Sequence, residues 1–340
     1  MLWGNLTPTK VLVACLRFQV NLVRKVFFFH FFSAFCSSSI VNIKSLTSIA
    51  RDIYYRDPEL FVKQAVVDRY IDDLAHTLSI SRHSLNIVAT AKGLIAGCLG
   101  ILKKDNHTLD CSSDDDGILI PDITQIKDIF FRGLKWILVI EKEATFRSLA
   151  ASKYTEYSRA GKGLIVTAKG YPDISTRAFI HTLRSRPLCP PIYALTDCDP
   201  HGLSILSTYA HGSSALAHEN ANLAVPDMRW LGVRLQDVIE TQSRGDKADD
   251  ADVAGVLSLT PRDRKLATNM LGSNPAFQEE LHPGWRRELQ CMLFMNVKAE
   301  IQILGGAESL GTWVDVRVRG WESEHSVLLG SITLNEMVRF

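Results

Sequence analysis

Short apolar runs alternate with helical patterns over the middle of the chain. The runs are continuously apolar, which is typical of strands buried on both faces, and they occupy residues 137–140, 164–167 and 192–195. A helical pattern follows each run, at residues 144–154, 174–183 and 203–210, and Asp173 is a suitable cap for the second of these helices. Strands that alternate with helices predict a parallel sheet in an α/β fold.

A different pattern precedes this region. Apolar residues recur at helical spacing from 58 to 78, and Ser81 is a suitable cap for a second helix over 82–92. Two short apolar segments, 99–102 and 118–120, then predict a hairpin around a polar loop. Two helices joined by a tight turn and followed by a hairpin are typical of a winged-helix domain with a helix-turn-helix.

The pattern after residue 210 is less regular. It predicts a strand at 228–233, a polar surface loop at 242–252, a helix that starts at Thr260-Pro261, and a last long helix over 285–304. The length of 340 residues suggests about two domains.

Composition narrows the functional classes only slightly. The net charge is +1, so any surface for nucleic acid has to be a local basic patch. The seven cysteines contain no C-x-x-C pair, which disfavours zinc and fits reduced thiols. The apolar run at 26–32 is far shorter than the ~20 residues of a membrane span, so we expect no membrane partner.

Acidic residues follow two of the predicted buried strands. Glu141 follows the strand at 137–140, and Asp197 and Asp199 follow the strand at 192–195, before a predicted turn at Pro200-His201-Gly202. The carboxyl ends of parallel strands carry the sites of α/β sheets, and clustered carboxylates need a counter-ion such as Mg²⁺. The three acids are therefore candidate Mg²⁺ ligands, in a layout that resembles a Toprim fold. The alternative is an ordinary capped loop.

A tyrosine pair lies between arginines in the run Arg51-Asp52-Ile53-Tyr54-Tyr55-Arg56. A tyrosine hydroxyl, with an ordinary pKa near ~10, attacks a phosphodiester only when a cation or base helps to remove its proton. Arg51 and Arg56 offer guanidinium groups that can hold phosphate. On spacing alone, a pair of amphipathic core tyrosines is the simpler interpretation.

Basic and polar residues supply candidate DNA contacts. Arg82, His83, Asn86 and Lys92 lie on the predicted second helix of the helix-turn-helix, which can enter a groove of DNA. Lys169 belongs to a glycine-containing stretch before a helix start, where phosphate can approach the helix N-terminus. A solvated basic face and ordinary turn chemistry are the alternatives.

Together these motifs resemble one family over residues 47–304. The segments that carry the resemblance occur in the family's order: Arg51 to Tyr55, Val67 to Ala75, Lys92 to Leu94, Val139 to Ala144, Gly161 to Arg177, Asp197 to Gly202, Leu231 to Val233 and Trp285 to Leu304. The family comprises the A subunit of DNA topoisomerase VI and its eukaryotic relatives, the meiotic recombination proteins of the sporulation-eleven type.

The resemblance implies a domain order and a division of labour. A winged-helix domain over 47–125 would carry the catalytic Tyr55, and a Toprim α/β domain with C-terminal helices would occupy 126–304. Tyr55, assisted by Arg51, would attack a DNA phosphate and stay attached to the 5′ end. The poorly patterned segment 1–46 and the atypical tail 305–340 are expected to be foreign to the fold.

The resemblance also implies cofactors and partners. Glu141, Asp197 and Asp199 would hold Mg²⁺. The tyrosine of one protomer works with the metal site of the other, so a homodimer on double-stranded DNA is expected. The further partners are accessory recombination proteins and a topoisomerase VI B-like subunit. The expected location is the nucleus, on chromosomes.

Several functions stay open at this point. The meiotic branch is favoured, which implies a DNA transesterase that makes double-strand breaks and initiates meiotic recombination. The runner-up is a topoisomerase VI A subunit, of the ATP-hydrolysing type II class, that relaxes DNA with an ATPase B subunit. The chain contains no G-x-x-x-x-G-K-[ST] motif, so ATP would be bound by another chain. A non-cleaving DNA-binding paralogue and a nuclease that uses metal-activated water are further alternatives.

Overall fold

The computed structural model describes residues 48–49, 55, 62–78, 87–88, 91–213, 216–217, 219–244 and 255–321. The chain divides into two compact units, residues 1–90 with 213–221 and residues 91–212 with 222–340. The second unit therefore begins upstream of the predicted domain boundary between residues 125 and 126.

The first unit contains the predicted first helix. Helix α5 spans Gln64–Leu78, and it buries Val67, Tyr70 and Ile71 on one face. The predicted second helix is wrong at its centre, because Ile87–Val88 forms strand β2 and pairs in parallel with β1, Ser48–Ile49. Two β-branched residues in succession favour a strand, and pairing with β1 decides the conformation. The turn between the predicted helices lies outside the described residues.

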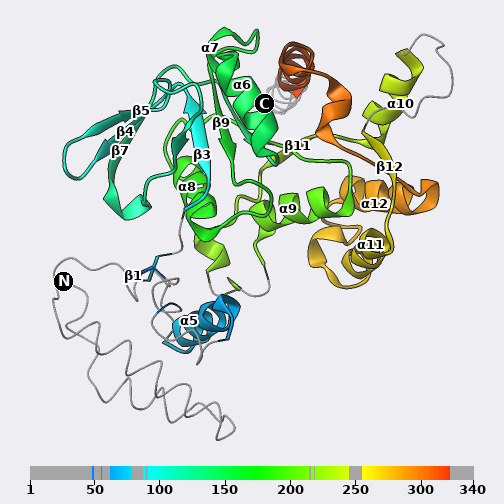
Figure 1. The fold of residues 1–340 in the computed structure, drawn as a ribbon, viewed down its shortest axis with the longest axis horizontal. Coiled ribbons are helices and arrows are strands. Elements are labelled where there is room, and N and C mark those ends of the chain that lie inside the picture. Colours follow the sequence, from blue (N-terminus) through cyan, green and yellow to red (C-terminus); the bar gives the residue numbers. More distant parts are fainter. Residues whose placement is uncertain are drawn as a thin grey trace, which may run out of the picture. The chain divides into compact units, whose positions relative to one another are not determined.

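A six-stranded sheet forms the centre of the second unit (Figure 1). Its order is β11-β10-β8-β9-β3-β6, with bounds Arg229–Gly232, Ile192–Leu195, Trp136–Ile140, Gly163–Thr167, Leu94–Gly97 and Ile118–Leu119. The first four of these strands are parallel neighbours, which confirms the predicted α/β fold. β3 and β6 continue the sheet in antiparallel pairing.

The predicted hairpin of the wing is wrong. Strand β6 pairs with β3, whereas β4, Leu99–Lys103, pairs with β5, Thr108–Asp110, and with β7, Ile126–Phe131. The cause is β3, a strand that the sequence pattern did not predict. Its residues Leu94 and Ile95 are buried, and they take Ile118–Leu119 into the main sheet.

The predicted helices of the second unit occur in the predicted order, and α10 is an additional helix that was not predicted. Helices α6 to α12 have the bounds Glu143–Ala151, Tyr154–Tyr157, Ile174–Arg184, Pro200–His211, Leu235–Arg244, Pro261–Ser273 and Pro283–Met295. Short 3-10 turns occupy Ile123–Gln125, Asn220–Asn222, Pro275–Phe277 and Ile301–Leu304. Asp173 caps α8 as predicted, and Thr260 and Asp263 form a capping box at the start of α11.

Three predicted elements end differently. The helix predicted at 144–154 breaks at Lys153, whose φ is +52°, and α7 follows. The predicted surface loop at 242–252 begins inside α10, which continues to Arg244. The long helix predicted over 285–304 ends at Met295, because Asn296 has a φ of +55° and residues Val297–Ala299 form β13 against β12, Val256–Ser258.

Part of the predicted foreign tail belongs to the core of the second unit. Residues 307–321 are helical, and Leu310, Val314 and Val318 are buried in the hydrophobic core. Asp315, also buried, accepts hydrogen bonds from the Tyr154 hydroxyl (2.7 Å), the Ser158 hydroxyl (2.6 Å) and the Arg159 N–H (3.1 Å). The expectation that residues 305–340 are foreign to the fold is therefore wrong for residues 305–321.

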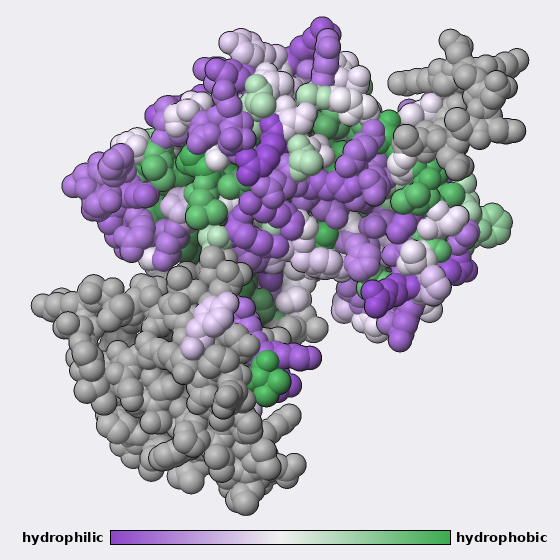
Figure 2. Space-filling view, viewed as in Figure 1, coloured by the Kyte–Doolittle hydropathy of each residue, from purple (hydrophilic) through white to green (hydrophobic). Residues whose placement is uncertain are grey.

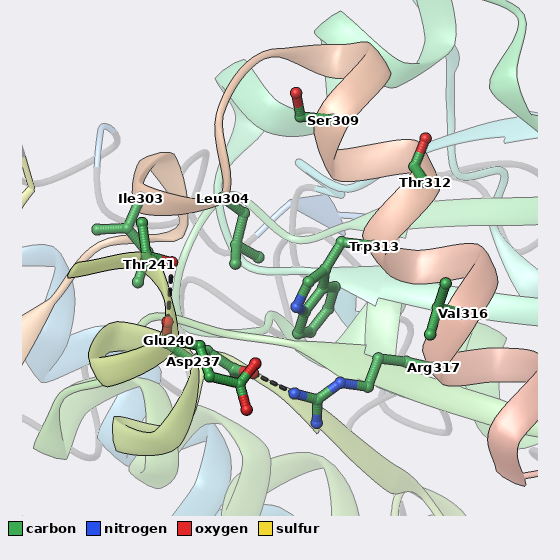
Figure 3. Close-up of a pocket in the computed structure, with 10 residues that line it drawn as sticks. All are labelled: Asp237, Glu240, Thr241, Ile303, Leu304, Ser309, Thr312, Trp313, Val316 and Arg317. Carbon is green, nitrogen blue, oxygen red and sulfur yellow. Dashed lines mark hydrogen bonds and ion pairs between the residues drawn. The ribbon is translucent and has the colours of Figure 1, made fainter. Parts of the chain in front are cut away.

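The same helix contacts α10 along a pocket of about 370 Å³. Figure 3 shows Trp313, Val316 and Arg317 reaching from the helix towards α10, where Arg317 pairs with the buried carboxylate of Asp237. Arg317 also lies against the Trp313 ring, 4.9 Å from the ring centre. These contacts connect the helix at 307–321 to α10.

Hydrophilic residues predominate on the visible face of the second unit (Figure 2). Figure 2 shows hydrophilic residues across much of the visible face of the second unit, with smaller hydrophobic areas between them. No helix within the described ranges combines the length and the apolar character that crossing a membrane requires. The five cysteines in those ranges are free thiols.

Candidate metal and DNA-cleavage site

Sheet register places two of the candidate acids side by side. Strands β8 and β10 are parallel neighbours although β9 lies between them in sequence, and Ile140 is paired with Leu195 at their carboxyl ends. Glu141 directly follows β8, and Asp197 follows β10 by two residues. Because these strand ends adjoin, Glu141 Oε2 accepts a hydrogen bond of 3.0 Å from the Asp197 N–H.

The third acid begins helix α9. Asp199 is the N-cap, and its Oδ1 accepts a 2.6 Å hydrogen bond from the Gly202 N–H. The predicted turn at Pro200 to Gly202 is therefore wrong, since these residues are the first turn of α9, with Pro200 at a position that suits its fixed φ. A Cβ at position 202 would lie 2.3 Å from the Asp197 carbonyl oxygen, so this close approach requires glycine.

Backbone N–H groups position all three carboxylates. Glu141 is held by the Asp197 N–H, Asp199 by the Gly202 N–H, and Asp197 Oδ1 by the Ile301 N–H at 2.8 Å. In each case the backbone N–H contacts one carboxylate oxygen, and the second oxygen of Asp197 lies 3.2 Å from Lys142 Nζ. The arrangement thus fixes three acids at one edge of the sheet without using up their charge.

A lysine that sequence reasoning missed contacts this cluster. Lys142 Nζ lies 3.2 Å from Asp197 Oδ2, 3.0 Å from Glu300 Oε2 and 2.9 Å from Gln302 Oε1. The only sequence feature that pointed to Lys142 was its position next to Glu141. No sequence feature pointed to Glu300 and Gln302, because their segment was predicted as helix.

Segment 299–302 forms one wall of the cluster. Ala299 and Cys198 exchange two backbone hydrogen bonds of 2.8 and 3.0 Å, as in an antiparallel pair. This pairing carries Ile301 to Asp197 and carries Glu300 and Gln302 to Lys142. The end of the chain's predicted last helix therefore becomes part of the candidate site.

Burial and like charge shift the acids towards their neutral forms. Burial, together with the negative charges of Asp197 and Asp199, raises the pKa of Glu141 to about 8. Burial also raises the pKa of Asp197, although the Ile301 N–H and Lys142 oppose the shift. Burial alone would lower the pKa of Lys142, but the carboxylates of Asp197 and Glu300 outweigh it and raise that pKa. The cluster is short of positive charge.

Replacing Glu141 by Gln is expected to stabilise the metal-free protein near pH 8. The pKa of Glu141 is about 8 in the folded protein and 4.5 as a reference value, so ionisation of this group lowers the stability of the wild-type protein as pH rises between these values. The Gln variant lacks the ionisable group and therefore lacks this loss. Thermal unfolding in a chelator from about pH 5 to about pH 9 measures the difference.

A Glu143→Gln variant is the control for this experiment. Arg147 and Lys169 hydrogen-bond to Glu143 and lower its pKa, so its substitution is expected to destabilise the protein at neutral pH. If the unfolding temperatures of the wild type and of Glu141→Gln depended equally on pH, the raised pKa of the buried Glu141 carboxyl group would be contradicted.

A basic and aromatic loop lies beside the acids. Lys169, with a φ of +59°, directs its Nζ to Glu143 at 3.1 Å, and the Gly170 N–H donates to the Glu141 carbonyl at 2.9 Å. Lys92 Nζ donates to the Tyr171 carbonyl oxygen at 2.8 Å. The loop after β9 is thereby fastened to the strand end that carries Glu141.

Tyr55 belongs to the first unit, and the residue is 68% exposed. Arg51, Arg82, His83 and Asn86 lie outside the described residues. Lys92 lies in the second unit and outside any helix, so it is not on the predicted recognition helix. The DNA-binding roles of these residues and of Lys169 stay predictions.

A family profile for the Toprim domain shared by the A subunit of topoisomerase 6 and Spo11 matches residues 136–310, which is more than half of the chain. The chain belongs to this topoisomerase 6 A-subunit/Spo11 family. A second profile, described as "Type IIB DNA topoisomerase", matches residues 31–87, so the similarity begins upstream of residue 47. Toprim domains generally bind a divalent metal ion, and the acid cluster lies within the Toprim match.

Individual members of the family are similar over three quarters of the chain. "Meiotic recombination protein SPO11-1" of Oryza sativa is 40% identical over 255 residues, 75% of this chain and 63% of the relative. "Meiotic recombination protein SPO11" of Homo sapiens is 34% identical over 254 residues, 75% of this chain and 61% of the relative. The A subunit of DNA topoisomerase 6 from Arabidopsis thaliana is 35% identical over 268 residues, 77% of this chain and 58% of the relative. The chain thus spans about three fifths of the length of these relatives.

Proposed function

We propose that this chain is a DNA transesterase that makes double-strand breaks and initiates meiotic recombination. The observation that carries the proposal is the set of three backbone-held carboxylates at the joined ends of β8 and β10, in a chain of the topoisomerase 6 A-subunit/Spo11 family. Similarity to the meiotic recombination proteins of rice and human supports the meiotic branch.

The proposed reaction exchanges one phosphodiester for another. The Tyr55 oxygen attacks a DNA phosphorus atom, a Tyr55–phosphate bond forms at the 5′ end, and the bond to the 3′ oxygen breaks. The tyrosine proton leaves, and the departing 3′ oxygen is protonated to a hydroxyl, so no water or ATP is consumed. Arg51 is proposed to hold the phosphate and offset its charge. The exposed side chain of Tyr55 is compatible with access to DNA.

The acid cluster fits Mg²⁺ by its donor chemistry. Glu141, Asp197 and Asp199 offer carboxylate oxygens, the ligands that this hard cation prefers. In the described part of the chain no group of three acidic, histidine or cysteine side chains is arranged to hold an ion as it stands. Lys142 Nζ lies 3.2 Å from Asp197 Oδ2, and Asp199 Oδ1 accepts a hydrogen bond from the Gly202 N–H. When bound, the ion would neutralise charge on the phosphate oxygens.

The proposed partners follow from the family. Two copies of the chain would act on double-stranded DNA, each cutting one strand, with the tyrosine of one copy serving the acids of the other. Lys92, Lys169, Arg82, His83 and Asn86 are proposed DNA contacts. Accessory recombination proteins and a topoisomerase VI B-like subunit complete the proposed partners, and chromosomes in the nucleus are the proposed location.

Recovery of covalent adducts tests the proposed function. In the presence of Mg²⁺ and the B-like subunit, the full chain is expected to yield DNA with protein attached to the 5′ ends after denaturation. A chelator is expected to lower the yield by about 10²-fold or more, because the acid cluster alone is short of positive charge. Breaks with free 5′ phosphates would identify a water-using nuclease, and DNA binding without breaks would identify a non-cleaving paralogue.

Similarity to the topoisomerase 6 protein of Arabidopsis thaliana supports the second candidate function, a topoisomerase. In that case, adducts would be transient, and supercoiled DNA would be relaxed when an ATPase subunit is supplied together with ATP. Relaxation in the same reaction mixture would favour this candidate over the meiotic one.

A further inference from the structure

Lys142 is the cation that the acid cluster already contains. Asp197 is 8% exposed, and its Oδ1 is taken by the Ile301 N–H, so Oδ2 is the oxygen left for a metal ion. Lys142 Nζ lies 3.2 Å from that same Oδ2. A divalent cation bound to Oδ2 would lie close to this ammonium group, and the two positive charges would repel each other. Simultaneous contact of both cations with Asp197 Oδ2 is therefore unfavourable.

Two other side chains besides Asp197 contact Lys142 at the site. Glu300 Oε2 and Gln302 Oε1 lie 3.0 and 2.9 Å from Nζ. Both belong to the segment that pairs through Ala299 with Cys198, so this backbone pairing positions them in addition to the contact of the Ile301 N–H with Asp197 Oδ1. If Lys142 gives up Asp197, these two acceptors remain in contact with its ammonium group.

We propose that Lys142 is a positioning residue that neutralises Asp197 in the metal-free protein and passes to Glu300 and Gln302 when Mg²⁺ binds. This inference rests on the proposed metal site. Glu300 is thereby not a metal ligand but the residue that keeps the displaced ammonium group of Lys142 paired. The Mg²⁺ affinity of the site then depends on the competition between Asp197 and Glu300 for this ammonium group.

The test measures Mg²⁺ affinity of the full chain by calorimetry and by the rise in unfolding temperature with Mg²⁺ concentration. Lys142→Met is expected to bind Mg²⁺ about tenfold more tightly, because the competing charge is gone, and to unfold at a lower temperature without metal. Lys153→Met removes an exposed lysine just after α6 and is expected to change neither quantity.

Glu300 is tested through Lys142. Glu300→Gln is expected to weaken Mg²⁺ binding about fivefold in the wild-type background, and by less than about twofold when combined with Lys142→Met. Equal effects in both backgrounds would overturn the role of Glu300. Unchanged or weaker Mg²⁺ binding by Lys142→Met would overturn the role of Lys142.

An Asp197→Asn variant separates this inference from the proposed metal site. If the wild type binds no Mg²⁺, or if Asp197→Asn binds it equally well, the metal assignment itself fails. If Asp197→Asn loses Mg²⁺ binding while Lys142→Met behaves as the wild type, the metal site stands and only the exchange of Lys142 is refuted.

Discussion

Replacing Tyr55 by Phe is expected to abolish covalent attachment of the protein to DNA. The substitution removes a single oxygen, which is the proposed nucleophile, and leaves the ring. Because the residue is 68% exposed and keeps its ring, we expect the variant to fold. Loss of a nucleophile typically costs about 10⁴-fold or more in rate, so adducts should fall below detection. The measurement is recovery of DNA bound to denatured protein from reactions with equal amounts of the two proteins.

The adjacent tyrosine supplies the matched control. Tyr54→Phe makes the same chemical change one position earlier and is expected to retain adduct formation. If Tyr54→Phe loses the adduct and Tyr55→Phe keeps it, the nucleophile has been assigned to the wrong member of the pair. If breaks without adducts persist in Tyr55→Phe, the chain is a water-using nuclease.

Replacing Asp197 by Asn is expected to reduce cleavage by about 10²- to 10³-fold. The amide oxygen of Asn keeps an acceptor for the Ile301 N–H, so the loop keeps its position, but one of the three charges that would hold Mg²⁺ is lost. Cleavage is measured as initial rate at saturating Mg²⁺ with a fixed DNA substrate.

Stability distinguishes loss of chemistry from loss of fold in this variant. Since burial raises the pKa of Asp197, a neutral side chain at this position is expected to leave the metal-free unfolding temperature unchanged or higher. Asp227→Asn, which removes an exposed carboxylate paired with Arg184, is the control and should cleave normally. An inactive Asp197→Asn protein that also unfolds early would mean that Asp197 supports the fold rather than the reaction.

The acid cluster could be predicted because its strands are unambiguous. The strands before Glu141 and Asp197 are completely buried, and continuous apolar runs bounded by polar residues leave few alternatives. The pattern does not say that β8 and β10 are neighbours, and this adjacency is what joins the acids. It depends on how helices of the parallel sheet pack, which no local signal records.

The misassigned strands share one physical cause, which is pairing between segments distant in sequence. Val297, Ile301 and Leu304 continue the apolar spacing of α12, so a longer helix was predicted. Asn296 instead ends the helix, and β12 and Cys198 provide hydrogen-bond partners that draw Val297–Ala299 into extended structure. Lys142 went unrecognised for the same reason, because its partners Glu300 and Gln302 reach it only through this pairing.

The helix at 307–321 has a consequence for truncated forms of the protein. Its residue Gly311 lies so close to the Tyr154 ring that a Cβ there would be 2.9 Å from it, and Asp315 binds the hydroxyl of the same tyrosine. A chain truncated before residue 305 would leave Tyr154 uncovered and would expose to water the core residues that pack against Leu310, Val314 and Val318. Such truncated chains are therefore expected to accumulate poorly in cells, whatever their catalytic residues.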